Sequence, residues 1–267
     1  MMEGSDPAAI LREIQSLARS GHVPVRFVTP RQIQQAQGSE APQGVIAFAE
    51  PLAEVDLSDL VGLTGDGTRP ASPRAGTEDP PAANAADEDE EAALQAAPEK
   101  VEIVVKRREA GKAAFLVVVD GVTDPQNLGA LLRSAECAGV TGVVLPRHRS
   151  AHVTPTVAKV AAGAVEHVKI AVVPGVPGAL QELERLGVWT VGLDERGPEP
   201  LFGLQLGDRP VALVIGAEGK GLAPLSRQRC DVLARIPLHG SIDSLNVSAA
   251  GAVAMFEVTR QRAAQQG

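Results

Sequence analysis

Three residues in one short stretch, Asn127, Gly129 and Arg133, have types and spacing that could support chemistry on a ligand. Gly129 and Arg133 are four residues apart, so they share one face of a helix. The missing Cβ at Gly129 is then expected to leave room beside the arginine for something other than protein. Asn127 falls in the first turn, where the side chain and the free backbone amides point out of the helix end. A surface arginine and a helix-end asparagine with structural roles would give the same pattern, so this stretch alone does not decide a function.

The elements that must position these residues are a strand and a helix. The apolar run at 115–119 predicts a buried strand, and a polar turn leads from it into a helix over 125–138. Asp124 is a suitable N-cap and Pro125 a suitable first helical residue, while Gly139 can end the helix in a left-handed conformation. The apolar residues of the helix recur at helical spacing and are expected to pack on a sheet.

Two later stretches contain further candidates, LVIGAEGKGL at 213–222 and IPLHGSIDSLNVSA at 236–249. Taken alone, the glycines at 216, 219 and 221 indicate a tight turn as readily as a ligand site. An ordinary Rossmann enzyme would have its glycine-rich turn after an early strand, with an acidic residue about 20 positions later. The early turn here, DGVTDPQN, has one glycine, which argues against that class.

Together the three stretches resemble the three motifs of the SpoU/TrmH family of RNA ribose 2′-O-methyltransferases, in the same order and near the same spacing. The resemblance covers roughly residues 100–265. Within the family, the segment 145–170 is most similar to the branch that methylates a guanosine of bacterial 23S rRNA. The resemblance implies an α/β fold of the SPOUT type, with a parallel sheet and a C-terminal trefoil knot. It also implies S-adenosylmethionine as cofactor and a homodimer paired through the knotted region.

The resemblance also assigns expected roles to individual residues. The cofactor-contacting positions are Gly216, Ile236 and Leu245, with Leu193 as a plausible fourth wall from the end of the preceding strand. The polar positions expected at the site are Asn127, Arg133, Glu218, Ser244 and Asn246. Apolar contacts suit an adenine ring, and backbone groups suit its polar edge.

Arg133 is expected to act as an electrostatic partner and not as a base, because a guanidinium is effectively always protonated. It would clamp the phosphate beside the target ribose and stabilise the developing alkoxide, while a phosphate oxygen or water takes the proton. Asn127 and Glu218 would orient Arg133 and the ribose. No metal is required, and the five scattered histidines have no ligand spacing.

The formal net charge of −8 is unevenly placed along the chain. Counting Asp and Glu against Lys and Arg gives −4 for residues 1–63, −7 for 64–99 and +3 for 100–267. Basic clusters occur at 106–112 and at Arg147 and Arg149, which flank His148, although such clusters are often only solvated surface. The chain has no Tyr, one Trp and five Phe, so an aromatic stacking platform is not expected. RNA would therefore be bound through phosphate contacts and shape.

Three regions are predicted along the chain. Residues 1–63 form a small, apparently abbreviated lobe resembling the L30e-like substrate-binding domain of the family, with helices at 7–20 and 30–37 and strands at 23–28 and 44–50. Residues 64–99 form an acidic linker, whose composition predicts disorder. Residues 100–267 form the methyltransferase domain. Its predicted strands are at 115–119, 142–146, 168–173, 188–193, 211–215 and 232–236. Its predicted helices are at 125–138, 154–163, 177–186, 222–229 and 247–262.

Composition sets further expectations. The chain has no run long and apolar enough for a membrane span and no signal-peptide pattern, so a cytoplasmic protein is expected. Cys137 and Cys230 are expected to be small core residues without a disulfide or zinc role. The helix at 247–262 is apolar almost all round, which predicts a partner subunit, although a fully buried core helix would have the same composition.

Alternative functions remain at this level. One is an RNA-binding relative without methyltransferase activity, and another is a 2′-O-methyltransferase acting on tRNA or another rRNA site. An unrelated nucleotide-binding enzyme with a Rossmann domain is the third.

Overall fold

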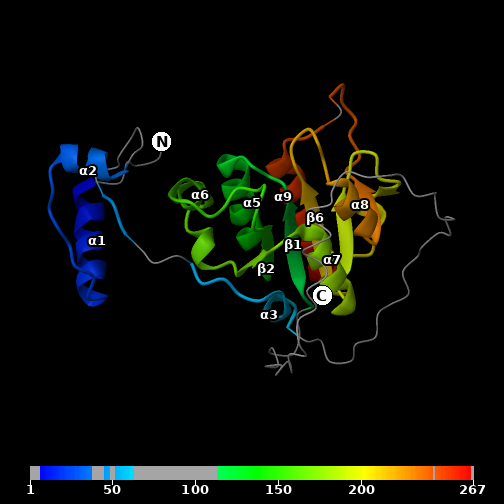
Figure 1. Cartoon of the computed structure of the whole chain (residues 1–267), viewed down its shortest axis with the longest axis horizontal. Coiled ribbons are helices and arrows are strands. Elements are labelled where there is room, and N and C mark those ends of the chain that lie inside the picture. The colour runs from blue at the N-terminus through cyan, green and yellow to red at the C-terminus, as the bar shows by residue number, and fades with distance from the viewer. Residues whose placement is uncertain (1–6, 38–44, 49–51, 63–112, 243, 266–267) are drawn as a thin grey trace. The chain divides into compact units, whose positions relative to one another are not determined.

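The computed structural model describes residues 7–37, 45–48, 52–62, 113–242 and 244–265. Contacts divide the chain into two compact units, with the boundary between Pro51 and Leu52 (Figure 1). The predicted acidic linker and the basic cluster at 106–112 lie outside the described residues. In the part of the chain that is described, no helix is long and apolar enough to cross a bilayer.

The first unit contains the two helices expected from the sequence, α1 (Pro7–Ser20) and α2 (Pro30–Gln37). The predicted strand at 23–28 is wrong, because these residues have no strand conformation. The predicted strand at 44–50 is described only over 45–48, which is not a strand either. A strand needs a neighbour to pair its backbone groups, and the described residues of this unit supply none.

The second unit is built on a seven-stranded sheet of parallel strands in the order β3-β2-β1-β6-β4-β7-β5. The strands are β1 (Phe115–Asp120), β2 (Gly142–Pro146), β3 (Ile170–Val173), β4 (Trp189–Leu193), β5 (Glu199–Pro200), β6 (Val211–Gly216) and β7 (Val232–Arg235). All six predicted strands of this region are confirmed, and β5 is additional. The parallel α/β sheet expected from the sequence is therefore present.

Helices cover both faces of this sheet. They are α5 (Pro125–Cys137), α6 (Pro155–Ala161), α7 (Val176–Arg185), α8 (Pro224–Arg229) and α9 (Val247–Ala264), with 3-10 turns η1 (Ala164–Glu166) and η2 (Leu201–Gly203). One core contains α5, α6 and α9 with one face of the sheet, and the other contains α7 with the opposite face. The side chains of β1 alternate between these two cores, which is why its apolar run is uninterrupted.

The second unit also includes α3 (Leu57–Val61), which belongs to the region predicted as the small lobe up to residue 63. Leu60 and Val61 are buried in the core on the α7 face, and Leu60 packs directly against Gly142 at the start of β2. The Val55 amide donates to the Ile170 carbonyl at 3.0 Å. Apolar burial therefore places this short segment with the sheet. The second unit begins at Leu52, before the predicted end of the small lobe at residue 63.

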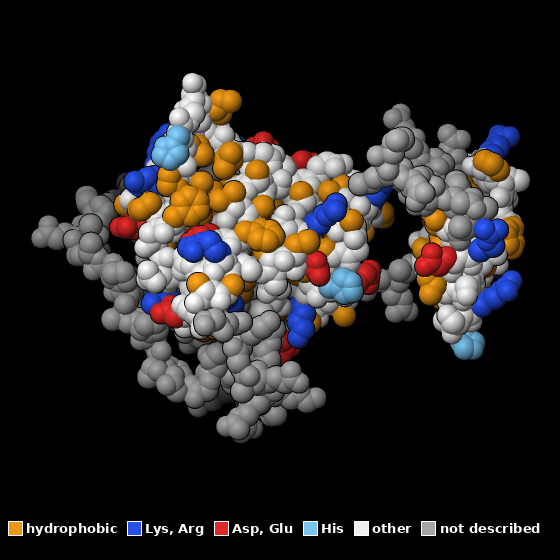
Figure 2. All heavy atoms as spheres, turned by 180° about the vertical axis from the view of Figure 1, so that it is seen from behind, with side chains coloured by type: hydrophobic (Ala, Val, Ile, Leu, Met, Phe, Trp, Pro, Cys, Tyr) orange, Lys and Arg blue, Asp and Glu red, His pale blue; other side chains and the backbone are white. Residues whose placement is uncertain are grey.

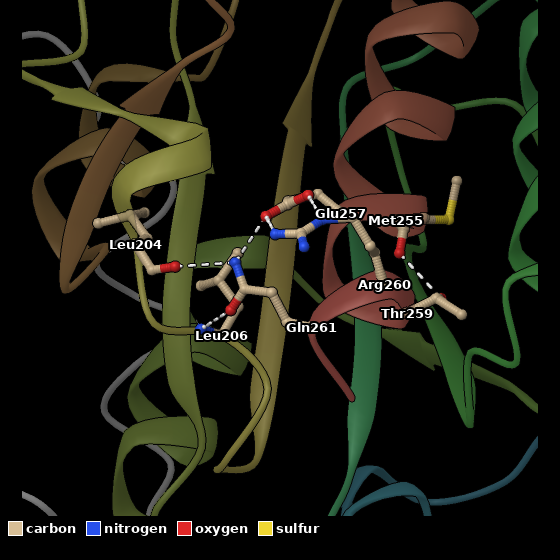
Figure 3. A network of polar contacts seen from close by, with 7 residues as sticks. All are labelled: Leu204, Leu206, Met255, Glu257, Thr259, Arg260 and Gln261. Carbon is tan, nitrogen blue, oxygen red and sulfur yellow. Dashed lines mark hydrogen bonds and ion pairs between the residues drawn. The ribbon is translucent and has the colours of Figure 1, made fainter. Parts of the chain in front are cut away.

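The last helix, α9, is tied to the loop after η2 by side-chain contacts (Figure 3). Gln261 donates to the Leu204 carbonyl at 2.9 Å and accepts from the Leu206 amide at 2.7 Å. Gln261 also donates to Glu257 at 2.7 Å, and Arg260 forms two hydrogen bonds with the same carboxylate. The half-buried C-terminal part of α9 is thus held by a polar network, in addition to its apolar face.

The helix α9 is not buried all round, so the alternative of a fully buried core helix is wrong. Val247, Ala254 and Val258 are buried on one face. Val253 and Phe256 are 37% and 48% exposed on another. Exposed hydrophobic side chains also lie close together on the face of this unit drawn in Figure 2.

Candidate active site

The N-terminus of α5 holds Asn127 in a fixed position. The Asp124 carboxylate caps the helix by accepting from the backbone amides of Gln126 at 3.0 Å and Asn127 at 3.3 Å. Pro125 begins the helix and Gly139 follows it with φ +72°, as predicted. The capped turn leaves Asn127 only 7% exposed at the carboxyl end of β1. A buried amide needs hydrogen-bond partners for its donor and acceptor groups.

Asn127 finds those partners on two distant segments of the chain. Its Nδ2 donates to Glu218 Oε2 at 3.1 Å, and its Oδ1 accepts from Asn246 Nδ2 at 2.9 Å. The three side chains form one hydrogen-bonded chain across all three sequence motifs. Because a carboxylate only accepts, its contact fixes which end of the Asn127 amide faces Asn246.

Asn246 is positioned by α9, for which it is the N-cap. Its Oδ1 accepts from the amides of Ser248 and Ala249 and from the Ser248 hydroxyl. The helix lies very close to both α5 and β6, because a Cβ at Gly251 would lie 2.4 Å from Leu131 of α5 and 2.9 Å from Ile215 of β6. Ser248 was not a sequence candidate, although its place two residues after an asparagine cap is a recognisable signal.

Glu218 lies in a tight turn after β6. The amides and carbonyls of Ala217 and Gly221 exchange hydrogen bonds of 2.9 and 2.8 Å across the turn. Gly219 and Gly221 have φ of +73° and +68°, a conformation that side chains rarely adopt. The late glycines thus form a tight turn, and that turn presents Glu218 to Asn127.

Gly216 allows a close approach of the backbone. A Cβ at this position would lie 2.2 Å from the Gly221 carbonyl carbon and 2.4 Å from the Leu222 nitrogen. The chain itself therefore occupies the space that a side chain at residue 216 would need, and the predicted cofactor contact at Gly216 stays a prediction.

Asp120 is a positioning residue that the sequence reasoning missed. This buried residue ends β1, and its Oδ2 accepts from the Ala223 amide at 2.8 Å. The contact joins the turn before α5 to the exit of the turn that carries Glu218. A polar residue that ends an apolar strand at the edge bearing the other candidates is the signal that could have identified it.

Gly129 and Arg133 do not form the open face expected from their spacing. A Cβ at Gly129 would lie 2.6 Å from Val160 Cβ and 2.9 Å from the Val157 carbonyl oxygen, so α6 fills that space. The expectation of room for a ligand beside Gly129 is therefore wrong. Arg133 is exposed, and its guanidinium has no hydrogen-bond or ion-pair partner among the described residues.

The apolar candidates lie at the same edge of the sheet. Leu193 ends β4 and Ile236 follows β7, the adjacent strand, and both are partly exposed. Leu245 is 41% exposed just before the α9 cap. Ser244 is exposed and has no hydrogen bond among the described residues, so it is not part of the hydrogen-bonded set of Asn127, Glu218 and Asn246.

The two cysteines have different environments. Burial raises the pKa of Cys230 to about 12, with the negative charges of Asp120 and Asp231 adding to the effect. Its thiol therefore stays protonated at neutral pH and packs as a core group, as predicted. Cys137 is exposed at the end of α5, so its predicted core position is wrong. Within the described ranges, no three His, Cys, Asp or Glu side chains are grouped closely enough to hold a metal ion.

The parallel α/β sheet and the hydrogen-bonded set of Asn246, Asn127 and Glu218 at its carboxyl edge are the features to compare with known families. The model of the SpoU rRNA Methylase family matches residues 114–256, which is more than half of the chain. The chain belongs to this family. The solved structures it resembles have SPOUT-type methyltransferase folds.

Individual relatives are more specific. The chain is 47% identical over 153 residues to the 23S rRNA (guanosine-2'-O-)-methyltransferase RlmB of Xylella fastidiosa, covering 57% of this chain and 61% of that relative. The structure resembles the SpoU methyltransferase AviRb from Streptomyces viridochromogenes in complex with AdoMet. The TM-score is 0.53 and the identity 29%, covering 56% and 58% of the two chains. It also resembles an AdoMet-bound rRNA methyltransferase from Sinorhizobium meliloti, with TM-score 0.53 and 27% identity over 58% and 62%. The match thus spans about three fifths of the curated relative.

Proposed function

We propose that the chain is an S-adenosylmethionine-dependent RNA ribose 2′-O-methyltransferase acting on a guanosine of 23S rRNA. Family membership and the RlmB relative support the reaction and the substrate. The observation that carries the proposal is the hydrogen-bonded chain from Asn246 through Asn127 to Glu218. Asn127 is buried in this set, whereas Glu218 and Asn246 are exposed, so the set opens to solvent at the carboxyl edge of the parallel sheet, where α/β proteins bind ligands.

The residues at this edge fit the proposed cofactor. Leu193, Ile236 and Leu245 are apolar and partly exposed, as contacts for an adenine ring must be. Gly216 contributes by allowing the neighbouring turn to close, because the backbone of Gly221 occupies the space where a Cβ of residue 216 would lie. S-adenosylmethionine, when bound, supplies an electrophilic methyl group. The two AdoMet-bound relatives support this assignment.

Arg133 is the proposed electrostatic partner of the substrate. Its charge is not neutralised by any described residue, so it is free to bind the phosphate beside the target ribose with its planar fork. There it would stabilise the 2′-oxygen as the proton leaves to a phosphate oxygen or water. Asn127 and Glu218 would orient the ribose hydroxyl, and Ser244 and Asn246 complete the proposed polar set.

We also propose the finer features of the family for this chain. The chain leaves β6 and forms β7 on the far side of β4, and it then returns so that Asn246 bonds to Asn127. Helix α9 follows Asn246 and packs against β6. This path is consistent with a knotted C-terminal segment. The exposed Val253 and Phe256 support a homodimer through this region. Residues 1–51 would form the RNA-binding lobe, residues 64–99 a flexible acidic linker, and the protein would be cytoplasmic.

Methyl transfer to unmodified 23S rRNA transcribed in vitro tests the function, with isothermal titration of S-adenosylmethionine alongside. Arg133→Ala should lower turnover by roughly 100-fold or more while cofactor affinity is retained. Arg133→Lys should restore little, because a point charge does not reproduce the fork. Arg185→Ala on α7, which removes an exposed arginine paired with Glu182, is the matched control. Full activity of both Arg133 variants would refute the proposed role.

Light scattering tests the assembly. The expected mass is about twice 27.6 kDa, and Val253→Asp should lower both the dimer content and the activity. A fully active monomer would contradict the proposed interface.

A further inference from the structure

Residues 147–152, here called the basic loop, join β2 to α6 and present several cationic or ionisable side chains. Arg147, His148, Arg149 and His152 are all exposed. The guanidinium groups of Arg147 and Arg149 have no hydrogen-bond or ion-pair partner among the described residues. Several other arginines in this unit do have partners. Arg227 pairs with Asp194, for example, and Arg262 donates to three backbone carbonyls.

The surrounding sequence supplies no opposite charge. Between Glu136 and Glu166 the chain contains no acidic residue, whereas it contains Arg147, Arg149 and Lys159. A solvated charged surface is usually mixed in sign, so an extended segment of one sign favours an anionic partner.

The basic loop is attached to the candidate active site. The Ala151 amide and the Ser150 hydroxyl both donate to the Val122 carbonyl, at 2.8 and 3.0 Å. Val122 lies in the turn between β1 and α5, two residues before the Asp124 cap that holds Asn127. The loop thus lies at the carboxyl edge of the sheet, directly beside the first motif.

The backbone of the loop is held in an unusual conformation. Arg149 has φ +59°, a left-handed value that costs a residue with a Cβ about 1–2 kcal/mol. The Arg147 amide donates to the Val173 carbonyl at 2.7 Å, which anchors the other end of the loop on β3. Strain of this kind persists only where the surrounding structure imposes it, and it often marks functional segments.

We propose that the basic loop binds the RNA phosphates next to the methylated nucleotide, with Arg147 and Arg149 as the contacting groups. This inference rests on the proposed function and adds a substrate-binding surface to it. A guanidinium matches the geometry of a phosphate, and phosphate contacts set the register of a nucleic acid on a protein. Because the loop is hydrogen-bonded to Val122 in the turn before α5, RNA bound to the loop is held in register with Asn127.

The test compares RNA binding of the full-length chain at several salt concentrations, with unmodified 23S rRNA transcript as the probe. Log K, with K the association constant for RNA, falls as log salt rises. The double variant Arg147→Gln/Arg149→Gln should make this negative slope shallower by roughly 0.7–0.9 per arginine. At about 0.1 M salt this corresponds to roughly fivefold weaker binding per contact. S-adenosylmethionine affinity and melting temperature should stay unchanged, since neither guanidinium contacts the fold.

Two further variants sharpen the result. Arg147→Lys/Arg149→Lys keeps both charges and should keep most of the salt slope. Lys169→Gln removes one charge at the amino end of β3, the opposite edge of the sheet, and should leave slope and affinity at wild-type values. The proposed function fails separately, if the wild-type chain binds the transcript without methylating it. Wild-type slope and affinity in the double glutamine variant would overturn the role of the loop, and so would a wild-type chain that binds no RNA.

Discussion

Replacing Gly216 by alanine should destabilise the second unit, because the added Cβ would meet backbone atoms that cannot move independently. Real Cβ atoms stay at least 3.0 Å from such neighbours, whereas this one would lie 2.2 Å from the Gly221 carbonyl carbon. Relief requires the turn after β6 to open by about 1 Å. That movement breaks the paired hydrogen bonds between Ala217 and Gly221 and strains the bond from Ala223 to Asp120.

The magnitude follows from these contacts. Overpacking a well-packed site costs about 1–3 kcal/mol, and each hydrogen bond lost adds about 1 kcal/mol. A total of about 3–5 kcal/mol, at about 2–4 °C per kcal/mol for a domain of this size, lowers the melting temperature by about 6–20 °C.

Thermal unfolding without ligand is the assay, and Gly219→Ala is the matched control. Gly219 lies in the same turn with φ +73°, but a Cβ there would meet nothing within 4 Å, so only the left-handed strain of about 1–2 kcal/mol applies. Gly216→Ala should therefore be clearly the less stable variant. If it melts like Gly219→Ala and instead loses S-adenosylmethionine binding, the reasoning is refuted and the glycine is a ligand contact, as the sequence alone suggested.

Three further predictions concern the rest of the chain. Hydrogen bonding from Arg260 holds the pKa of the Glu257 carboxyl below its ordinary 4.5, so this stabilisation is present at neutral pH and is lost as pH falls through the folded pKa. Glu257→Gln should lower the melting temperature at pH 7 more than at about pH 3, whereas Glu182→Gln, in a more exposed pair of the same spacing, should not change the pH profile. Leu60→Ala should cost about 2–5 kcal/mol in denaturant unfolding, and a loss under about 1 kcal/mol would exclude α3 from the core. Deleting residues 70–95 should shift the melting temperature by less than about 2 °C, because their composition offers no core residues, and a larger shift would contradict the predicted linker.

The sequence was a good guide wherever structure follows from local chemistry. The strand before α5 is a run of apolar residues, and Asp124, Pro125 and Gly139 bound the helix as local capping rules predict. The strand predicted at 23–28 has equally favourable residues, but strand formation depends on a partner that the described residues of the first unit do not contain.

The error at the candidate site concerns a close approach between two segments of the chain. Gly129 faces Val160, so protein fills a space that spacing alone assigned to a ligand. Helical spacing gives the direction of a side chain but not what lies in front of it. The burial of α3 was missed for a related reason, since five residues are too short for a periodic pattern.

The three motifs are joined by the side chains of Asn246, Asn127 and Glu218, whose hydrogen-bond donors and acceptors allow one arrangement. Asn246 uses its oxygen for the N-cap of α9, so only its amide nitrogen remains for Asn127. Asn127 must then offer its oxygen to Asn246 and its nitrogen to Glu218, which can accept but not donate. Each orientation follows from the one before, beginning at the helix cap. A displacement of α9 therefore reaches Glu218 through two hydrogen bonds, which makes the packing of that helix a condition for the geometry of the site.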